Sequence, residues 1–512
     1  MRHRRNEIRN GVAVRQRSAA SCLQVPGGCE LGRGMDSKGS SAGNHGKVPA
    51  FLKFAYGSGA MAEGVKNSVF NTFLLFYYTG VLGLPGSLAG TALFLAMCFD
   101  AVSDPLVGYL SDHTRSRWGR RHPWMYAAIL PMGLSVYGLL SPPAGLGETE
   151  LFFWMTGLSI AVRQSLTLHM IPRNALLPEM TYDYDERTGL ISISFLLGWV
   201  GGLGLTQLAW LVLIPAVPGG RMNPEAYQAI GFWGAWIAAI GMFIATAGTQ
   251  RLVPQLRVAE ATPLGFRAFW GEITNALRNE SFRMILFGGI IVSAAANFQE
   301  VFGLYMNTYF WEFTDADIAR LGLFLAVAVL VAVVATRPVT RLSDKRRTAI
   351  GIAAFLLVWG PLPVAGRLLG LLPENGSPML LPLITVHLMV SLIPAVAMGI
   401  LLGSMFMDTI DESELETGIR QEGVFGAANA FALKAVGGVG NLMGGMAIEW
   451  IDFPLQASVA TVSPEKIFWL GIVAGPGMIL FYVAGFFFLT RYSITRERYL
   501  DIQKQLEARR SK

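Results

Sequence analysis

Apolar runs long enough to cross a lipid bilayer recur along nearly the whole of this 512-residue sequence. A bilayer core of about 30 Å needs roughly 20 apolar residues in a helix, and hydropathy indicates about twelve such runs. The composition agrees, because 52% of the residues are hydrophobic and 15% are charged, against about 25% charged residues in soluble domains. We therefore predict an all-α polytopic membrane protein. The expected spans are 51–82, 86–110, 123–142, 150–178, 189–216, 226–249, 282–311, 316–339, 348–371, 379–406, 421–449 and 466–490.

Lys and Arg are distributed unevenly among the loops between these spans. The loops after spans two, six and eight and the C-terminal tail are basic, whereas the odd loops are poor in cations apart from Arg221 and Lys466. The positive-inside rule then predicts that both termini and the even loops are cytoplasmic. The net charge is +6, and we attribute the basic clusters to topology in the cell membrane and to contact with anionic lipid, not to nucleic acid.

The sequence repeats itself at an interval of about 230 residues, which is the size of six spans with their loops. Val69-Phe70 returns as Val301-Phe302, and Tyr77 returns as Tyr309. Ser111-Asp112 returns as Ser343-Asp344, and Thr188-Gly189 returns as Thr417-Gly418. A six-span unit repeated in tandem keeps its orientation, so two parallel, pseudo-symmetric halves are expected. This is the layout of major facilitator transporters, whose substrate site lies between the halves near the bilayer midplane.

The domain boundaries follow from the spans. We expect an N-terminal six-helix bundle over 47–250, a cytoplasmic linker over 251–281, a C-terminal six-helix bundle over 282–491 and a cytoplasmic tail over 492–512. Residues 1–46 are rich in Arg, Gly and Ser and lack the apolar core of a signal peptide. They are predicted to be a disordered basic extension, with Met35 as an alternative start. Cys22, Cys29 and Cys98 provide neither a disulfide framework nor metal-ligand spacing, and no cofactor is expected.

Two carboxylates, Asp100 and Asp104, lie in the middle of the second apolar run, and Pro105 follows them. A spacing of four residues puts both on one face of a helix. Ionisable groups at membrane depth are costly, so they indicate function. Pro105 removes a backbone donor and frees a carbonyl oxygen nearby. Two carboxylates with free carbonyls suit Na⁺ or a proton; the alternative is a structural pair neutralised by a neighbouring Lys or Arg.

The loop after span two predicts a latch at the cytoplasmic side. Asp112 at a helix end is expected to pair with a loop arginine or with the N-terminus of a neighbouring helix, and such pairs would break when the halves rock. The alternative is a topological anchor that does not switch. Two acidic stretches, 183–186 and 411–416, either contact the basic loops or remain solvated. The gating residues expected from this pattern and its repeat are Asp112, Arg117, Arg120, Arg121, Arg341 and Asp344.

Three segments together resemble the glycoside–pentoside–hexuronide:cation symporters, the melibiose permease family. The first is Asp100-Ala-Val-Ser-Asp-Pro-Leu-Val-Gly108 followed by the basic loop to Arg121. The second is Ile171-Pro-Arg-Asn-Ala-Leu-Leu-Pro-Glu179, and the third begins at Asp408 and runs through Gly418 to Gly423. Lys434 falls where family members keep a membrane lysine. The resemblance covers residues 50–490 and specifies the family but no substrate.

The resemblance implies that Asp100 and Asp104 bind the coupling cation, with Thr167 completing a Na⁺ site. Family members often have Asn where this chain has Ser103. The change weakens the case for Na⁺ over H⁺, although a hydroxyl and carbonyls still suit sodium. Lys434 is expected to balance the two carboxylates when the cation is absent. Both Na⁺ and H⁺ therefore remain open.

The sugar site departs further from the family. Galactoside transporters use acids on spans one and four and an arginine on span five, and these positions fall on Gly64, Met170 and Phe195. A different substrate is therefore implied. Glu63 and Lys66 either pair with each other or one of them faces the cavity. Asn297, Gln299 and Glu300 on span seven mirror the polar part of span one and are expected to face the same cavity, and His169 is either a proton relay or a packing residue. The expected substrate-binding residues are Glu63, Lys66, Arg163, Arg173, Asn174, Glu300 and Lys434.

These patterns favour a secondary active symporter that moves a small polar solute, such as a sugar, glycoside or uronate, by alternating access. One alternative is a carrier of lysolipid or another amphipath, which the family's eukaryotic relatives move. Another is a membrane sensor without transport. The sequence contains no nucleotide-binding or metal-ligand motif of an enzyme. We expect a monomer whose partners are the solute, the cation and the bilayer.

Overall fold

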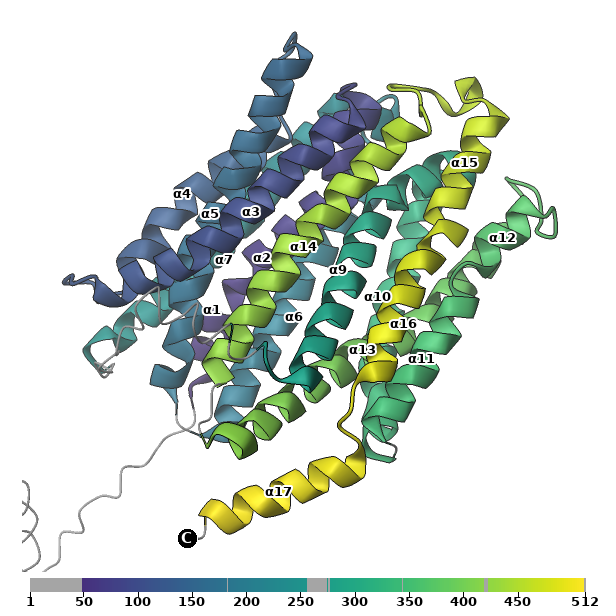
Figure 1. Cartoon of the computed structure of the whole chain (residues 1–512). Coiled ribbons are helices and arrows are strands. Elements are labelled where there is room, and N and C mark those ends of the chain that lie inside the picture. The colour runs from purple at the N-terminus through teal and green to yellow at the C-terminus, as the bar shows by residue number, and fades with distance from the viewer. Residues whose placement is uncertain are drawn as a thin grey trace, which may run out of the picture. The chain divides into compact units, whose positions relative to one another are not determined.

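The computed structural model describes residues 48–181, 183–255, 274, 277–342, 344–418 and 422–510, and within them every regular element is helical (Figure 1). The N-terminal half begins with a composite first span. Its elements are α1 (Ala50–Ser58), α2 (Ala60–Ser68), η1 (Val69–Leu74), η2 (Tyr77–Val81), α3 (Gly86–His113), α4 (His122–Leu139), α5 (Glu148–Met180), α6 (Tyr184–Leu208), η3 (Ala209–Leu213), η4 (Gly220–Met222), α7 (Pro224–Thr249) and η5 (Gln250–Gln255).

The C-terminal half repeats this plan and ends in one additional helix. Its elements are α9 (Glu280–Tyr305), η6 (Met306–Phe310), α10 (Asp315–Leu342), α11 (Lys345–Trp359), α12 (Leu362–Leu368), α13 (Leu380–Thr417), α14 (Glu422–Trp450), η7 (Val459–Thr461), α15 (Pro464–Ala474), η8 (Pro476–Met478), α16 (Ile479–Arg491) and α17 (Arg496–Arg510). Both η2 and η6 are π-helical, and they carry the repeat-related residues Tyr77 and Tyr309.

Each of the twelve predicted spans is helical, and eight helical segments within the described residues are long and apolar enough to cross a membrane by length and hydropathy alone. Span one is divided by Gly59, and spans nine and twelve are divided at proline-containing turns. The largest difference is span ten, because α13 continues to Thr417 instead of ending near 406. Its additional turns bury Asp408 and Glu412 against polar partners, so the acidic sequence there is helix and not loop.

Many large apolar side chains on the helices are exposed at the surface of the protein. Phe243 on α7, Val358 on α11 and Leu480 on α16 are examples. In water such a surface would be strongly unfavourable, whereas lipid tails are its natural environment. The side-chain distribution therefore agrees with the membrane fold expected from the sequence.

The two halves meet along α3 and α14, which lie side by side (Figure 1). Glycines make the close approach possible, because a Cβ atom on Gly445 would lie 2.1 Å from the carbonyl oxygen of Gly86. Small residues at helix crossings are the usual means of bringing membrane helices together. This contact places the acidic face of α3 next to α14 of the other half.

The ends of the bundle differ. We call the end that carries the 114–121 loop and the start of α11 the basic end. At the opposite end the halves are joined by Thr79 and Tyr305, whose hydroxyl oxygens are 2.5 Å apart, and by the ion pair of Arg221 with Asp315. The sequence-predicted tail forms helix α17, which buries Ile502 and Leu506. The extension 1–46, with Met35, Cys22 and Cys29, and most of the predicted linker lie outside the described residues.

Candidate functional site

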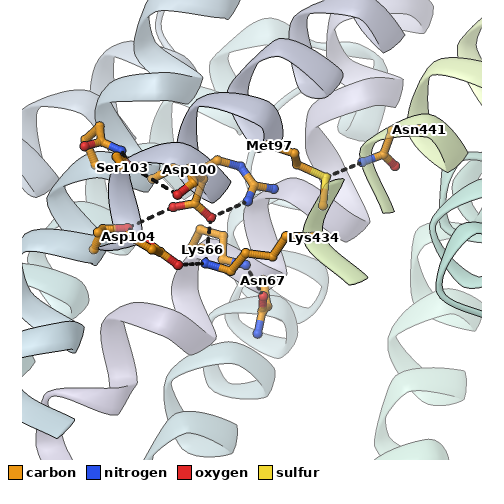
Figure 2. Close-up of polar contacts among 11 residues, drawn as sticks. Lys66, Asn67, Met97, Asp100, Ser103, Asp104, Lys434 and Asn441 are labelled. Carbon is orange, nitrogen blue, oxygen red and sulfur yellow. Dashed lines mark hydrogen bonds and ion pairs between the residues drawn. The ribbon is translucent and has the colours of Figure 1, made fainter. Parts of the chain in front are cut away.

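Asp100 and Asp104 lie one turn apart on α3 and share one hydroxyl group (Figure 2). The Oγ1 atom of Thr167 on α5 is 2.8 Å from Oδ1 of Asp100 and 2.9 Å from Oδ1 of Asp104. A threonine hydroxyl has one proton, so it donates to one carboxylate at a time. The three side chains that the sequence predicted as cation ligands therefore converge on one point.

Two cations compensate this pair of carboxylates. Lys434 of α14 places Nζ 3.1 Å from Oδ2 of Asp100 and in still closer contact with Oδ2 of Asp104. Arg163 of α5 places Nη1 3.4 Å from Oδ2 of Asp100 and stacks over Phe70. Asp100 is 5% exposed, so its charge would be costly without these partners. Lys434 comes from the other half, so the ion pair crosses the interface between the halves.

Ser103, the fourth predicted cation ligand, lies beside the carboxylates but is engaged with the backbone. Its hydroxyl donates to the carbonyl oxygen of Asp100 at 3.1 Å and is contacted closely by the side-chain amide of Gln164. Helix α3 continues through Pro105. Proline has no N–H to donate, so the carbonyl of Ala101 one turn earlier loses its helical partner.

A cavity of about 750 Å³ lies in the N-terminal half. It is bordered by α1, α2, η1, α5 and α6. Three of the predicted substrate residues line it, namely Glu63, Arg173 and Asn174. Lys66, by contrast, donates to Oδ1 of Asn67 at 2.5 Å, so the predicted alternative of a Glu63–Lys66 pair is not formed.

The remaining predicted substrate residues lie elsewhere. Arg163 and Lys434 contact the carboxylates of α3, and Glu300 of α9 accepts a hydrogen bond of 3.2 Å from Asn71. The expectation that the polar residues of span seven share one cavity is wrong for Asn297 and Gln299. Asn297 donates to the carbonyl of Ser293 one turn earlier on α9, and Gln299 accepts from Tyr482 of α16, so both bonds stay within the C-terminal half.

The positions that bind galactosides in the resembling family do border the cavity. Gly64, Met170 and Phe195 all line it. At Gly64 a Cβ atom would lie 2.0 Å from the carbonyl oxygen of Gly198, so no side chain fits there. The polar group on this span is one residue earlier, at Glu63.

Two cavity residues were missed in the sequence. Asn67 and Asn71 follow Glu63 at intervals of four residues, and all three side chains are exposed along one side of the first span. The periodicity of polar residues within an apolar run was the available signal. His169, considered as a proton relay, is fully buried and lies 3.3 Å from the hydroxyl of Thr246, which is the environment of a packing residue.

The basic end contains the predicted pairing of Asp112. Arg121 places Nη2 3.4 Å from Asp112 and 2.9 Å from Glu179, and Arg120 lies 2.6 Å from the same glutamate. Glu179 on α5 is thus the shared acceptor, which the sequence reasoning did not single out. Arg117 is exposed and stacks over its neighbour Trp118, at 5.8 Å from the ring centroid.

The second half has a corresponding arrangement. Lys345 places Nζ 2.8 Å from Asp408, and Asp408 follows Glu179 by 229 residues, the same interval as Gly189 and Gly418. Asp344 caps α11 by accepting from the backbone N–H of Arg347 at 3.0 Å. The side chain of Arg341 lies outside the described residues.

Among the described residues, the two acidic stretches have partners at helix ends and on neighbouring helices. Glu186 pairs with Lys53 at 2.8 Å, and Asp183 caps α6. Asp411 accepts a hydrogen bond of 2.8 Å from Gln503 of α17. The prediction of two loops was wrong because both stretches belong to helix ends, where carboxylates find backbone donors and neighbouring helices.

Comparison with known proteins agrees with this architecture. The sequence pattern of one family, described as MFS/sugar transport protein, matches residues 55–496. An uncharacterized symporter of Synechocystis, sll1374, is 26% identical over 90% of this chain and 97% of its own length. The isoprimeverose transporter of Lactiplantibacillus pentosus is 26% identical, over 78% of this chain and 80% of its own. A glucuronide carrier protein homolog of Escherichia coli is 24% identical over 89% and 95%.

Solved structures show the same fold. The nucleoside transporter NupG superimposes with a TM-score of 0.54 at 14% identity, and the match covers 87% of this chain and 98% of NupG. The partially occluded, inward-open form of the xylose transporter XylE from E. coli has a TM-score of 0.50 at 15% identity, covering 87% and 96%.

Proposed function

Because the chain belongs to the MFS/sugar transport protein family, we propose that it couples the movement of a sugar or glycoside to that of one monovalent cation. As a member, it is a multi-pass membrane transporter and not an enzyme, and its resemblance to the glycoside–pentoside–hexuronide:cation symporters is confirmed. Relatives named as an isoprimeverose transporter and a glucuronide carrier homolog support a sugar substrate.

The contact of Lys434 with Asp100 and Asp104 carries this proposal. The lysine belongs to one half and the carboxylates to the other, and the ion pair lies within the membrane-spanning part of the chain. A cation that binds between the carboxylates takes over the role of the ammonium group and releases Lys434. Cation binding then alters the contact between the halves, which is the coupling that alternating access requires.

The charges in direct contact with one another support a stoichiometry of one cation. Asp100 and Asp104 carry two negative charges, and Arg163 and Lys434 supply two positive ones. When Lys434 withdraws, Arg163 remains beside Asp100 and leaves one net negative charge. A single monovalent cation, H⁺ or Na⁺, balances it, whereas a divalent ion would leave an excess charge in a medium of low dielectric.

The cavity supports an assignment of sidedness. On the first span it extends from Tyr56, near the basic end, to Thr72. Beyond it the opposite end is closed by Thr79 with Tyr305 and by Arg221 with Asp315. With the basic end cytoplasmic by the positive-inside rule, both termini are cytoplasmic and this conformation faces inward.

Thermal stability of the purified protein tests the cation site. A ligand that binds only the folded state raises the melting temperature by mass action. Na⁺ at constant pH, and pH at constant Na⁺, are varied for the wild type and for Asp104→Cys and Lys434→Ala. The matched controls are Asp452→Cys and Lys466→Ala, which break an ion pair of 2.6 Å outside the site.

The wild type and both controls are expected to respond to Na⁺ or to pH, and Asp104→Cys is expected to lose that response. Lys434→Ala has no ammonium group for the cation to displace. The dependence of its melting temperature on the cation should therefore differ from that of the wild type. A Lys434→Ala protein with unchanged cation dependence would count against the proposed coupling. The ion that shifts the wild type identifies the coupling cation.

A lysolipid carrier is the second candidate, because Phe195 and Trp199 expose 68% and 48% of their surface and line the cavity. The same measurement includes lysolipids and a panel of sugars. Stabilisation by lysolipid alone would favour this alternative, whereas stabilisation by a sugar supports the leading proposal.

A further inference from the structure

Two charged side chains inside the bundle face each other from different halves without an ion pair. Lys66 belongs to α2 of the N-terminal half and Glu300 to α9 of the C-terminal half, and neither forms an ion pair with any residue that the structure describes. Glu300 is exposed and Lys66 is half-buried. An unpaired charge at membrane depth is tolerated while water reaches it and becomes costly once water is excluded. A closed conformation must therefore provide both groups with partners.

Each of these charges holds one amide group of the cavity. Nζ of Lys66 donates to Oδ1 of Asn67 at 2.5 Å (Figure 2). Oε1 of Glu300 accepts from Nδ2 of Asn71 at 3.2 Å. Asn67 and Asn71 lie one helical turn apart on the first span, and both line the cavity. Two amides that face a ligand thus spend part of their hydrogen-bonding capacity on a charged side chain.

Glu300 is the acid best suited to pair with Lys66. The ammonium group attracts three carboxylates at longer range, those of Glu63, Asp100 and Glu300. Glu63 lies three residues earlier on the same helix, and the pair is not formed although neither backbone would have to move. Asp100 already contacts two cations, and these repel Lys66. Glu300 has a neutral amide as its partner, so an ion pair with Lys66 would satisfy both charges.

We propose that substrate binding replaces the two hydrogen bonds by an ion pair between Lys66 and Glu300. Sugar hydroxyl groups both donate and accept, so they take the place of the ammonium on Asn67 and of the carboxylate on Asn71. The released charges then join across the two halves as the cavity loses its water. The inference rests on the proposed sugar transport and specifies how the substrate links the halves.

This ion pair complements the release of Lys434. Cation binding removes one contact between the halves, that of Lys434 with the carboxylates of α3. Substrate binding supplies another, between Lys66 and Glu300. The new pair is neutral, so it leaves the charge balance of the proposed cation site unchanged. With the cation alone, one link is lost and none is gained, so closure is favoured when both ligands are present, as symport requires.

A double-mutant cycle in ligand affinity tests the pair. Calorimetry at a fixed Na⁺ concentration and pH compares the purified full-length wild type with Lys66→Met, Glu300→Gln and the double variant. The probes are isoprimeverose and the 4-nitrophenyl glycosides of glucose, galactose and xylose, and the tightest binder is used. Each single variant should bind about ten-fold more weakly, because it leaves one charge unpaired in the closed state.

The double variant should recover the affinity to within about three-fold of the wild type, because replacing both partners of a buried ion pair costs far less than removing one. Without glycoside, the effects of the two single changes on the melting temperature should add, since the pair is not formed in the conformation described here. This difference between the two conditions is the signature of a pair that the substrate induces.

Controls separate the pair from general effects of charge. Lys66→Arg keeps the charge and should bind within about three-fold of the wild type. Lys466→Met and Asp452→Asn, singly and together, break an ion pair of 2.6 Å outside the cavity and should bind as the wild type. A single cooperative melting transition shows that each variant is folded. If a neutral single variant does not fold, the double variant carries the test by itself.

The outcomes separate this inference from the proposed function. Losses that add in the double variant, or a double variant more than about ten-fold weaker than the wild type, overturn the inference and leave sugar transport intact. An equal coupling in the melting temperature without glycoside also overturns it, because the pair would then exist before the substrate binds. Lack of binding by every glycoside, in a protein that the coupling cation stabilises, overturns both.

Discussion

The guanidinium of Arg221 lies 2.9 Å from the carboxylate of Asp315, joining the segment before α7 to the first turn of α10. Arg221 also donates to Thr308 at 3.3 Å and contacts the carbonyl of Phe313 closely. All three partners belong to the C-terminal half. Arg221, one of the few cations in the odd loops, therefore helps to close the bundle at the end opposite the basic end.

The Arg221–Asp315 pair is expected to stabilise this closed end. A double-mutant cycle of Arg221→Ala and Asp315→Ala, followed by thermal or detergent unfolding, should give a coupling energy of about 1–3 kcal/mol, because both side chains are largely buried. The Lys466–Asp452 pair is the control, because Asp452 is 91% exposed and both residues lie in the C-terminal half, as Asp315 does. Exposed pairs contribute about 0–1 kcal/mol to stability. Equal couplings for both pairs would refute the role of Arg221.

Arg163 is expected to be required for the balance of charge at the proposed cation site. Arg163→Gln leaves two carboxylates facing Lys434 alone, and the loss of one partner of a buried ion pair costs about 3–5 kcal/mol. The melting temperature without added cation should fall, and the stabilisation by the coupling cation should grow. Arg163→Gln with Asp100→Asn restores the charge and should recover much of the loss. A single variant as stable as the wild type contradicts this account.

Gly64 is expected to tolerate no side chain. Gly64→Ala places a methyl group 2.0 Å from the carbonyl oxygen of Gly198, so α2 and α6 must separate. Overpacking of this kind costs about 1–3 kcal/mol or more. Gly157→Ala on α5 is the control, since nothing lies within 4 Å of its Cβ position, and it should be neutral or slightly stabilising. Similar melting temperatures for the two variants would show that α2 and α6 have room for a methyl group at this position.

Glu179 is expected to hold the basic end together. It accepts a hydrogen bond from Arg120 and forms an ion pair with Arg121, which is buried. Glu179→Gln removes the charge that both guanidinium groups share and should cost about 1.5–3 kcal/mol, the range for hydrogen bonds to charged groups. Glu416→Gln, at the exposed end of α13, should have little effect. The comparison is made by unfolding, and no difference between the two variants would reject the assignment.

Asp344 is expected to attach α17 in a pH-dependent manner. Partial burial by itself raises the pKa of Asp344, but hydrogen bonds from the backbone N–H groups of Arg496 and Arg347 outweigh this effect, so the pKa lies below its ordinary value of 3.8. A lowered pKa means that the stabilisation is complete above the unfolded value and is lost as pH falls through the folded value.

Hydrogen exchange of α17 measures this attachment. Protection at the first turn of α17 should be constant from neutral pH down to about pH 5 and should decrease below pH 3.8, the ordinary aspartate value. Asp344→Ala should reduce protection throughout this range, because it removes the acceptor for Arg496. Unchanged protection in that variant would mean that the apolar contacts of Ile502 and Leu506 are sufficient to hold α17 in place without Asp344.

The sequence predicted the fold because membrane spans are determined locally. An apolar run of spanning length must form a helix in lipid, and the repeat interval of Tyr77 and Tyr309 predicted two halves without any knowledge of contacts. The end of α13 could not be predicted in this way. Its acidic last turns resemble a loop in composition, and only the partners of Asp408 and Glu412 show why they remain helical.

The site was predicted unevenly for a related reason. Asp100, Asp104 and Thr167 are found from sequence, because charges at membrane depth are rare and the family motif is specific. Asn67 and Asn71 were missed, because the role of an asparagine within a span cannot be assigned until its helix face is known. Lys434 was expected both to balance the two carboxylates and to bind substrate, and Arg163 was assigned to the substrate. The structure places both cations against carboxylates more than 60 residues away in sequence.

The sequence alone therefore determined the number of spans, the two-fold repeat and the carboxylates of the proposed cation site, because each depends on hydropathy or on spacing along one helix. Only the tertiary structure decided which charges neutralise one another, which end of the bundle is closed and which residues border the cavity. Those properties depend on contacts between helices distant in the chain, such as that of Arg221 with Asp315, whose geometry is set by packing and not by local sequence.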